Sequence, residues 1–144
     1  MPYTTDSPFK SISILYRKSH IWLNSGCARA DLTAAQAVVI MILCDFEALT
    51  QDEITKRLSL DKSVIAKTVT KLEEGGFLLR APNPRDKRTY LIRPTEKAWQ
   101  VYPAIKEEVE GCFARMTQRM SDAEREEFRR LLLLAADTTL GLED

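Results

Sequence analysis

The sequence has little of what metal sites and disulfide frameworks need. Its 144 residues include one histidine and three cysteines, and the cysteines at 27, 44 and 112 form no closely spaced pair. An odd number of separated cysteines fits neither a disulfide framework nor a zinc site. We therefore expect no metal, no cofactor and a reducing, cytoplasmic compartment.

Long apolar segments and catalytic motifs are lacking as well. The opening residues, MPYTTDSPFK, have no apolar core, so we expect no signal peptide. The longest apolar run, residues 37–44, is too short to span a membrane, so we expect no membrane partner. No nucleophile elbow, phosphate loop, metal motif or telling pair of acid–base carboxylates is present, and an enzyme is not expected.

Net charge is also absent, because 21 basic residues balance 21 acidic ones. The charge is unevenly distributed, however. Residues 62–93 contain eight Lys or Arg and only three Asp or Glu. A local basic excess on a neutral chain attracts phosphate without general stickiness. The length is that of one typical domain.

Three capping boxes mark the starts of helices, each a Thr or Ser followed three residues later by Gln or Glu. They are Thr33 with Gln36, Thr50 with Glu53, and Ser121 with Glu124. Residues 9–25 roughly follow helical spacing, although the segment ISILY also fits a strand. Residues 96–119 form a further long helix, for which Thr95 is the expected cap.

Residues 61–77, DKSVIAKTVTKLEEGGF, predict a helix capped by Asp61 and ended by two glycines. Ile65, Val69 and Leu72 fall on one side at helical spacing. The opposite side carries small or basic residues and no acid: Lys62, Ser63, Ala66, Lys67, Thr70 and Lys71. Such a face suits the major groove of DNA, and on this segment alone an ordinary solvated face is equally compatible.

The flanking segments favour the DNA-binding interpretation. The short helix that follows Thr50 and the basic helix after it form a helix-turn-helix. Residues 77–80 and 90–93 then predict an antiparallel hairpin around the projecting loop APNPRDKRT. Together they predict a winged helix-turn-helix. The final helix has a wide apolar side with Phe128, Leu131 and Leu132, for which a partner subunit is the economical cover.

With these elements in place, the chain resembles the MarR family of bacterial winged-helix regulators. The resemblance rests on four motifs in order: Leu32-Thr33 with Gln36; Thr50-Gln51 with Glu53 and Ile54; Leu72-Glu73 with Gly76; and Asp86-Lys87-Arg88. The chain departs from the family pattern at the start of the long helix, Pro94-Thr95-Glu96-Lys97-Ala98. It also departs at Ala66 and Gly75, where the family often has threonine and a basic residue.

The resemblance implies a mainly α fold with a small β-hairpin wing and dimerisation helices at both ends. Residues 1–31 would form an arm and a dimerisation helix, residues 32–94 the winged helix-turn-helix, and residues 95–144 the C-terminal dimerisation helices. It further implies a homodimer on a palindromic operator, acting as a repressor or less often an activator of nearby genes. Release by a small, often aromatic, effector is part of the same expectation.

Arg88 is the foremost candidate contact, because a wing-tip arginine fits the narrow minor groove of A·T-rich DNA. Asp86 is expected to orient Arg88 by a charge-assisted hydrogen bond, and Arg85 and Lys87 to touch phosphate. On the helix, the sequence does not assign each contact. Lys67 and Lys71 suit a phosphate or a guanine edge, and Ser63 and Thr70 a phosphate or base. Ala66 suits contact with a thymine methyl group, and Lys62 is the remaining candidate DNA-binding residue on this helix.

For an effector, the resemblance implies a pocket between the dimer helices and the winged core. The candidate residues are Tyr16, His20, Trp22, Phe46 and Trp99, although plain packing is an alternative for each. Cys27 is the cysteine best placed to sense oxidants, whereas Cys44 lies in an apolar helix and is expected to be inert. A competing function for the whole chain is a winged-helix protein-interaction module without DNA binding.

Overall fold

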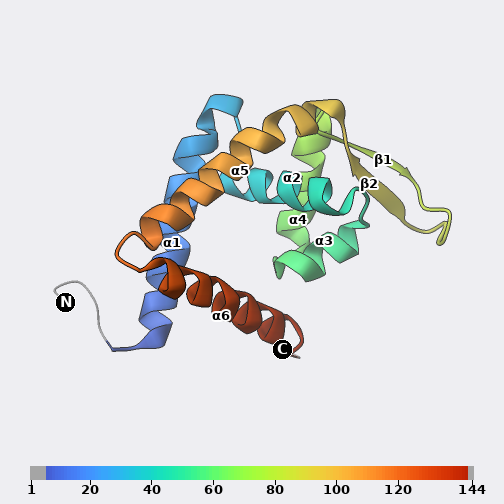
Figure 1. Ribbon diagram of the computed structural model, residues 1–144. Coiled ribbons are helices and arrows are strands. Elements are labelled where there is room, and N and C mark those ends of the chain that lie inside the picture. Colours follow the sequence, from blue (N-terminus) through green and yellow to red (C-terminus); the bar gives the residue numbers. More distant parts are fainter. Residues whose placement is uncertain (1–5, 143–144) are drawn as a thin grey trace.

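The computed structural model describes residues 6–142 and is mainly helical (Figure 1). Its elements in order are α1 (Pro8–Cys27), the 3-10 helix η1 (Ala28–Ala30), α2 (Ala34–Phe46), α3 (Gln51–Leu58), α4 (Lys62–Glu74), β1 (Leu78–Pro82), β2 (Tyr90–Pro94), α5 (Glu96–Met116) and α6 (Asp122–Leu140). The predicted fold class, helical with a two-stranded wing, is confirmed.

The N-terminal segment is a helix and not a strand. Pro8 occupies the start of α1, where its missing N–H costs no hydrogen bond. The helix continues to Cys27, beyond the predicted end, and η1 follows it directly. The chain then bends at Asp31, which has a left-handed φ of 57°, and α2 continues at 79° to the preceding helical segment.

All three predicted capping boxes form. At α2, for example, Thr33 Oγ1 accepts from Gln36 N at 3.2 Å, and Gln36 Oε1 accepts from Thr33 N at 2.9 Å. The boxes that begin α3 and α6 have the same two bonds. Local sequence therefore sets the start of these helices.

Two other predicted N-caps are confirmed in position but lack the capping hydrogen bond. Asp61 and Thr95 occupy the N-cap positions of α4 and α5, but neither side chain makes a capping hydrogen bond. The Thr95 hydroxyl instead donates to the Gly76 carbonyl oxygen at 2.6 Å. It thereby ties the start of α5 to the end of α4. The Asp61 carboxylate still lies at the positive end of the α4 dipole, where attraction needs no direct hydrogen bond.

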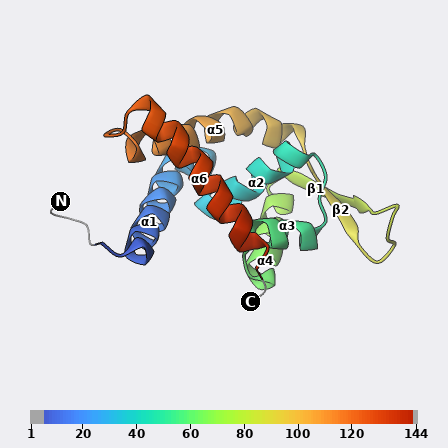
Figure 2. The ribbon, with the colours of Figure 1, turned by 60° about the horizontal axis from the view of Figure 1, so that its bottom comes forward.

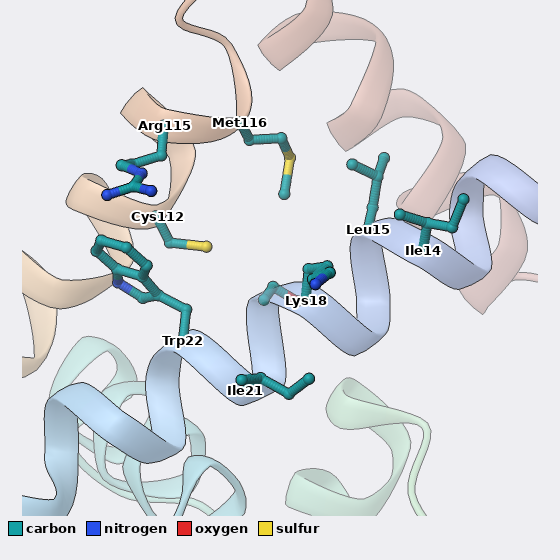
Figure 3. A pocket seen from close by; sticks show the side chains of 9 residues that line it. Ile14, Leu15, Lys18, Ile21, Trp22, Cys112, Arg115 and Met116 are labelled. Atoms are coloured by element: carbon teal, nitrogen blue, oxygen red, sulfur yellow. The ribbon is translucent and has the colours of Figure 1, made fainter. Parts of the chain in front are cut away.

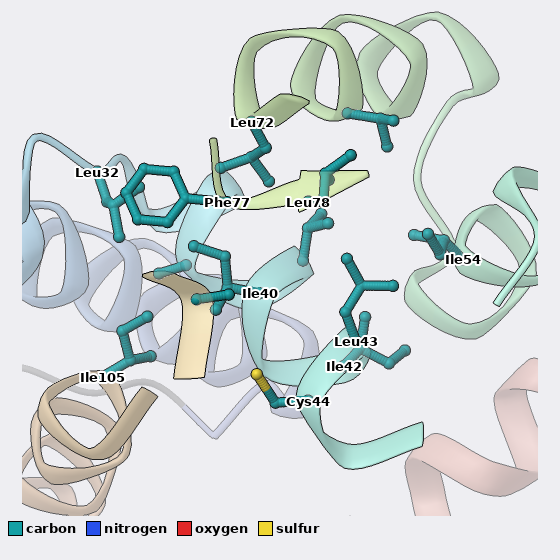
Figure 4. Close-up of a cluster of buried hydrophobic side chains, with 14 of the residues drawn as sticks. Leu32, Ile40, Ile42, Leu43, Cys44, Ile54, Leu72, Phe77, Leu78 and Ile105 are labelled. Carbon is teal, nitrogen blue, oxygen red and sulfur yellow. The ribbon is translucent and has the colours of Figure 1, made fainter. Parts of the chain in front are cut away.

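The core lies where α2 meets α4, the hairpin and α5 (Figure 4). Seven residues of α2 are buried, so this helix is covered nearly all round, as its apolar sequence predicts. Ile40 and Leu43 pack there with residues contributed by other elements, among them Leu72 of α4 and Ile105 of α5. Full burial of each such side chain contributes about 1.5–3 kcal/mol.

The wing is anchored at its base and free at its tip. β1 and β2 pair antiparallel, with Leu78 opposite Pro94 and Pro82 opposite Tyr90. Ile92 of β2 also exchanges two backbone hydrogen bonds with Leu49, of 2.7 and 3.1 Å. The hairpin is therefore tied to the segment before α3, and its far end projects from the body of the protein (Figure 1).

The C-terminal helix lies along the outside. Its first half contacts α5, where Phe113 and Phe128 stack with ring centroids 6.0 Å apart. None of the 19 residues of α6 is buried, however, and Leu131 to Leu134 are all exposed. α1 and α6 thus carry much of the exposed apolar surface, away from the wing (Figure 2).

Over residues 6–142, no single helix is both long and apolar enough to cross a membrane. One bent pair, Pro8–Ala30 with Ala34–Phe46 at 79°, reaches the required length and composition when taken together. The second member of that pair is the buried α2.

Candidate nucleic-acid interface

Helix α4 packs against the protein core on one side only. Ile65, Val69 and Leu72 are at most 1% exposed, as their spacing predicts. Thr68 joins them in the interior, where its hydroxyl donates to the Val64 carbonyl oxygen at 2.8 Å. Ser59, with a left-handed φ of 51°, makes the turn from α3 into α4 without glycine.

The opposite side of α4 is open to solvent. Of the six candidate residues on it, Ala66 is half-buried. The other five are exposed: Lys62, Ser63, Lys67, Thr70 and Lys71. Ala66, Lys67, Thr70 and Lys71 also line a shallow hollow of about 370 Å³. Glu74 borders the same hollow, so an acid stands at the C-terminal end of a face that is otherwise basic and small.

A hydrogen-bonded turn shapes the tip of the wing. Asn83, which is 8% exposed, donates from its side-chain amide to Thr89 Oγ1 at 2.9 Å and accepts from Arg85 N at 3.1 Å. The Thr89 hydroxyl donates in turn to the Asp86 carbonyl oxygen at 3.1 Å. These bonds close the loop and leave Arg85, Lys87 and Arg88 exposed on it.

Arg88 and Asp86 form the pair that their spacing predicts. Arg88 Nε donates to Asp86 Oδ1 at 3.1 Å, and Nη2 donates to Oδ2 at 3.3 Å. The Arg88 backbone N–H also bonds Oδ1, at 3.0 Å. The side-chain hydrogen bonds from Arg88, and to a lesser extent its backbone hydrogen bond, hold the pKa of Asp86 below its usual value. The Arg88 side chain remains 89% exposed, so it is oriented and still accessible.

Arg80 connects the wing to α4, a role that the sequence did not predict. Its Nη2 donates to Thr70 Oγ1 at 3.4 Å, and its Nε lies 3.4 Å from Glu73 Oε1. The three residues belong to β1 and α4, so their proximity depends on the fold. For Asn83 and Thr89 a local signal did exist, because asparagine and threonine commonly bond neighbouring backbone in turns.

The five effector candidates do not gather at one point. Tyr16 and His20 contact each other in α1, with ring centroids 4.2 Å apart and ring planes tilted by 38°. Phe46, the last residue of α2, has the guanidinium of Arg57 over its ring, 4.1 Å from the ring centroid. Of the last two candidates, Trp22 contacts α5 from α1, and Trp99 belongs to the first turns of α5. Trp22 Nε1 donates to the Glu108 carbonyl oxygen at 3.0 Å, and Trp99 packs edge-on against Tyr102.

Two adjoining hollows lie between α1 and the end of α5. The first, of about 390 Å³, contains Trp22, Lys18 and Arg115 (Figure 3). Its cationic groups face a lining that is mainly apolar, and the Arg115 guanidinium lies 5.0 Å from the Trp22 ring. The second, of about 260 Å³, contains His20 and is almost wholly apolar. Cys112 lines both.

The surroundings of Cys27 disfavour its thiolate form. It is the last residue of α1 and is 4% exposed. Burial, and secondly the charge of Glu108, raise its pKa. Burial together with Asp45 raises the pKa of Cys44 to about 11. Since the thiolate is the reactive form, both environments disfavour oxidant sensing.

Comparison with known proteins agrees with this architecture. Residues 32–90 match the sequence model of the MarR family. The chain is 26% identical over 102 residues to an uncharacterized HTH-type transcriptional regulator, YybA, of Bacillus subtilis, a match that covers 71% of this chain and 68% of that protein. It is 32% identical over 84 residues to the multiple antibiotic resistance protein MarR of Escherichia coli, a match that covers 58% of each.

A solved structure extends the likeness beyond the matched segment. A mutant MarR from E. coli, complexed with operator DNA, superimposes with a TM-score of 0.77 at 25% identity. That superposition covers 88% of this chain and 91% of the other, so the flanking helices are included with the winged core. The family match, the relatives and the shared fold agree: residues 32–90 match the MarR family of winged helix-turn-helix transcriptional regulators, and the chain as a whole shares the fold of a solved MarR.

Proposed function

We propose that the protein is a homodimeric, sequence-specific DNA-binding regulator that represses nearby genes. The observation that carries the proposal is the presence of two basic, exposed surfaces on adjoining elements. One is the outer side of α4, with Lys67 and Lys71, and the other is the wing tip with Arg88. Arg80 of β1 contacts Thr70 and Glu73 of α4, so the base of the wing lies against the helix.

The chemistry of each surface supports a different contact. Small and basic side chains on α4 allow the helix backbone to approach base edges in a major groove. An exposed arginine held at a wing tip suits the electronegative minor groove beside it. The E. coli relative is a MarR in complex with operator DNA, and the same mode of binding is proposed for this chain.

The apolar surfaces of the end helices support dimerisation. Phe9 and Ile12 on α1 are 79% and 63% exposed, and Leu133 on α6 is 67% exposed. A helix with no buried residue has little tertiary stabilisation, and isolated helices of this length are marginal in water. A second copy packed through α1 and α6 would bury these residues and present two α4 helices to a palindromic operator.

The hollow at Trp22 supports an effector site. Its volume falls in the range of small-ligand pockets, and Lys18 and Arg115 favour an anionic aromatic molecule. An effector there would lie where α1 meets α5, and it would act on DNA affinity by changing how the proposed dimer helices pack. Of the five predicted pocket residues, Trp22 lines this hollow and His20 lines the adjoining one. Tyr16, Phe46 and Trp99 line neither.

A fluorescence-anisotropy titration tests the DNA-binding proposal. The probe is palindromic DNA from the region upstream of the protein's own gene, the control is a scrambled duplex of equal length, and both are titrated at several salt concentrations. We expect tighter binding to the palindrome, with an affinity that falls steeply as salt rises. Equal affinity for both duplexes would reject sequence-specific binding. Protein partners recovered without any DNA affinity would favour the protein-interaction module.

A further inference from the structure

Thr70 differs from the other threonines within the helices of residues 6–142. Threonine in a helix usually donates its hydroxyl to the carbonyl oxygen four residues earlier. Thr55, Thr68, Thr138 and Thr139 all do so, at 2.7–2.9 Å. Thr70 makes no such bond in the described part of the chain, and its hydroxyl oxygen instead accepts from Arg80 Nη2.

The identity of the partner determines which way the Thr70 hydroxyl hydrogen can point. A guanidinium has only N–H donors and no acceptor. Arg80 therefore occupies a lone pair of Thr70 Oγ1 and cannot receive its hydrogen. That hydrogen is left for a group outside the protein, on the exposed side of α4 beside Lys67 and Lys71.

Arg80 is suited to orient a neighbour rather than to bind DNA itself. Its side chain is only 29% exposed, and its Nε is buried 3.4 Å from Glu73 Oε1. Glu73 offsets the arginine charge and holds the guanidinium against α4. The exposed lysines and Arg88, in contrast, have their charged groups in solvent.

We propose that Arg80 is a positioning residue that fixes Thr70 as a hydrogen-bond donor to an acceptor on DNA. Two acceptor sources share this chemistry: a phosphate oxygen, and a base acceptor in the major groove, such as N7 or O6 of guanine or O4 of thymine. The inference rests on the proposed DNA-binding function and adds a determinant to it. A donor at this position disfavours bases that present only a donor there, such as cytosine through its N4 amino group.

A double-mutant cycle tests the coupling. DNA affinity is measured for the wild type, Arg80→Gln, Thr70→Val and the double variant, with thermal unfolding to confirm that each protein is folded. Thr70→Val removes the hydroxyl at nearly constant shape, and we expect about a tenfold loss, the size of one hydrogen bond to a charged or base acceptor. Arg80→Gln should weaken binding less, and its effect should vanish in the Thr70→Val background.

Matched controls separate this role from plain structural damage. Thr55→Val removes a hydroxyl that already donates inside α3 and should leave DNA affinity within twofold. Thr70→Ser keeps the donor and should restore most of the affinity. The salt dependence should stay unchanged in Arg80→Gln, because a positioning arginine neutralises no phosphate, whereas a direct phosphate contact would reduce the slope by about 0.9.

Substituted operators distinguish the two acceptor sources. If Thr70 donates to a base, Thr70→Val loses affinity only for operators that carry the acceptor at one position. If it donates to phosphate, the loss is uniform across sequences. An Arg80→Gln effect of equal size with and without the Thr70 hydroxyl would overturn the inference while leaving the DNA-binding proposal intact. A wild-type protein without DNA affinity would overturn both.

Discussion

Replacing Arg88 with alanine should weaken DNA binding without weakening the fold. The Arg88 side chain is 89% exposed, and its ion pair with Asp86 is a surface one. Such pairs contribute little to stability, so we expect the thermal unfolding midpoint of Arg88→Ala to stay close to that of the wild type. An arginine in a DNA groove contributes about 1–3 kcal/mol to binding, which corresponds to a loss of affinity of roughly 5- to 150-fold.

The assay is an anisotropy titration at four or more salt concentrations. For each phosphate-equivalent charge that the substitution removes from the complex, the slope of log affinity against log salt should become shallower by about 0.9. In a dimer the substitution removes one such charge from each of the two wings. Arg119→Ala serves as the control, because Arg119 is an exposed arginine in the turn between α5 and α6. In Figure 1 that turn lies at the end of the molecule opposite the wing.

A second variant separates the charge of Arg88 from its orientation. Asp86→Asn keeps the arginine but removes the carboxylate that accepts three of its hydrogen bonds. We expect a smaller loss of affinity than in Arg88→Ala and an unchanged salt slope, because no cation is removed. If Arg88→Ala binds operator DNA with wild-type affinity and slope, the wing contact is refuted.

Three further substitutions test the fold and the assembly. Gly76→Ala should destabilise the protein by about 1–2 kcal/mol in denaturant titration, because Gly76 has a φ of 80° and alanine is strained there; an unchanged midpoint would contradict this. Asp45→Ala should return the pKa of Tyr102 from about 12 towards its ordinary value of about 10, because a hydrogen bond to Asp45 raises it. Because the pKa of Tyr102 is raised in the folded protein, the hydrogen bond to Asp45 contributes fully to stability below pH ~10, and this contribution is lost as the pH rises through about 12. An NMR titration of the tyrosine measures the pKa in both proteins. A Tyr102 pKa that stays near 12 in the variant would reject Asp45 as the cause. Leu133→Glu should shift the protein from dimer to monomer in analytical ultracentrifugation, because Leu133 is 67% exposed on a helix without buried residues; an unaltered dimer would exclude this face from the interface.

Local signals in the sequence predicted much of the fold. The capping boxes at Thr33, Thr50 and Ser121 involve residues three apart, so their hydrogen bonds depend only on the helix they begin. The stop at Gly76 and the pair of Asp86 with Arg88 are equally local. A property fixed by a few neighbouring residues can be predicted without knowledge of the tertiary structure.

The predictions that failed, or were not made, depend on contacts between distant segments. Thr95 is the N-cap residue of α5 but makes no capping hydrogen bond, because its hydroxyl donates to Gly76, 19 residues earlier. Arg80 reaches Thr70 only because the hairpin returns against α4. The contact of Phe46 in α2 with Arg57 in α3 was likewise not predicted.

Selection of binding sites from a random pool of duplex DNA tests the central claim most directly. The purified full-length protein is used for successive rounds of capture, and the retained DNA is sequenced. A homodimer that places two α4 helices in the major groove should enrich a palindrome whose half-sites are about one helical turn apart, roughly 10 base pairs, or a multiple of it. A retained pool with no enriched motif would contradict the claim that this protein reads DNA sequence.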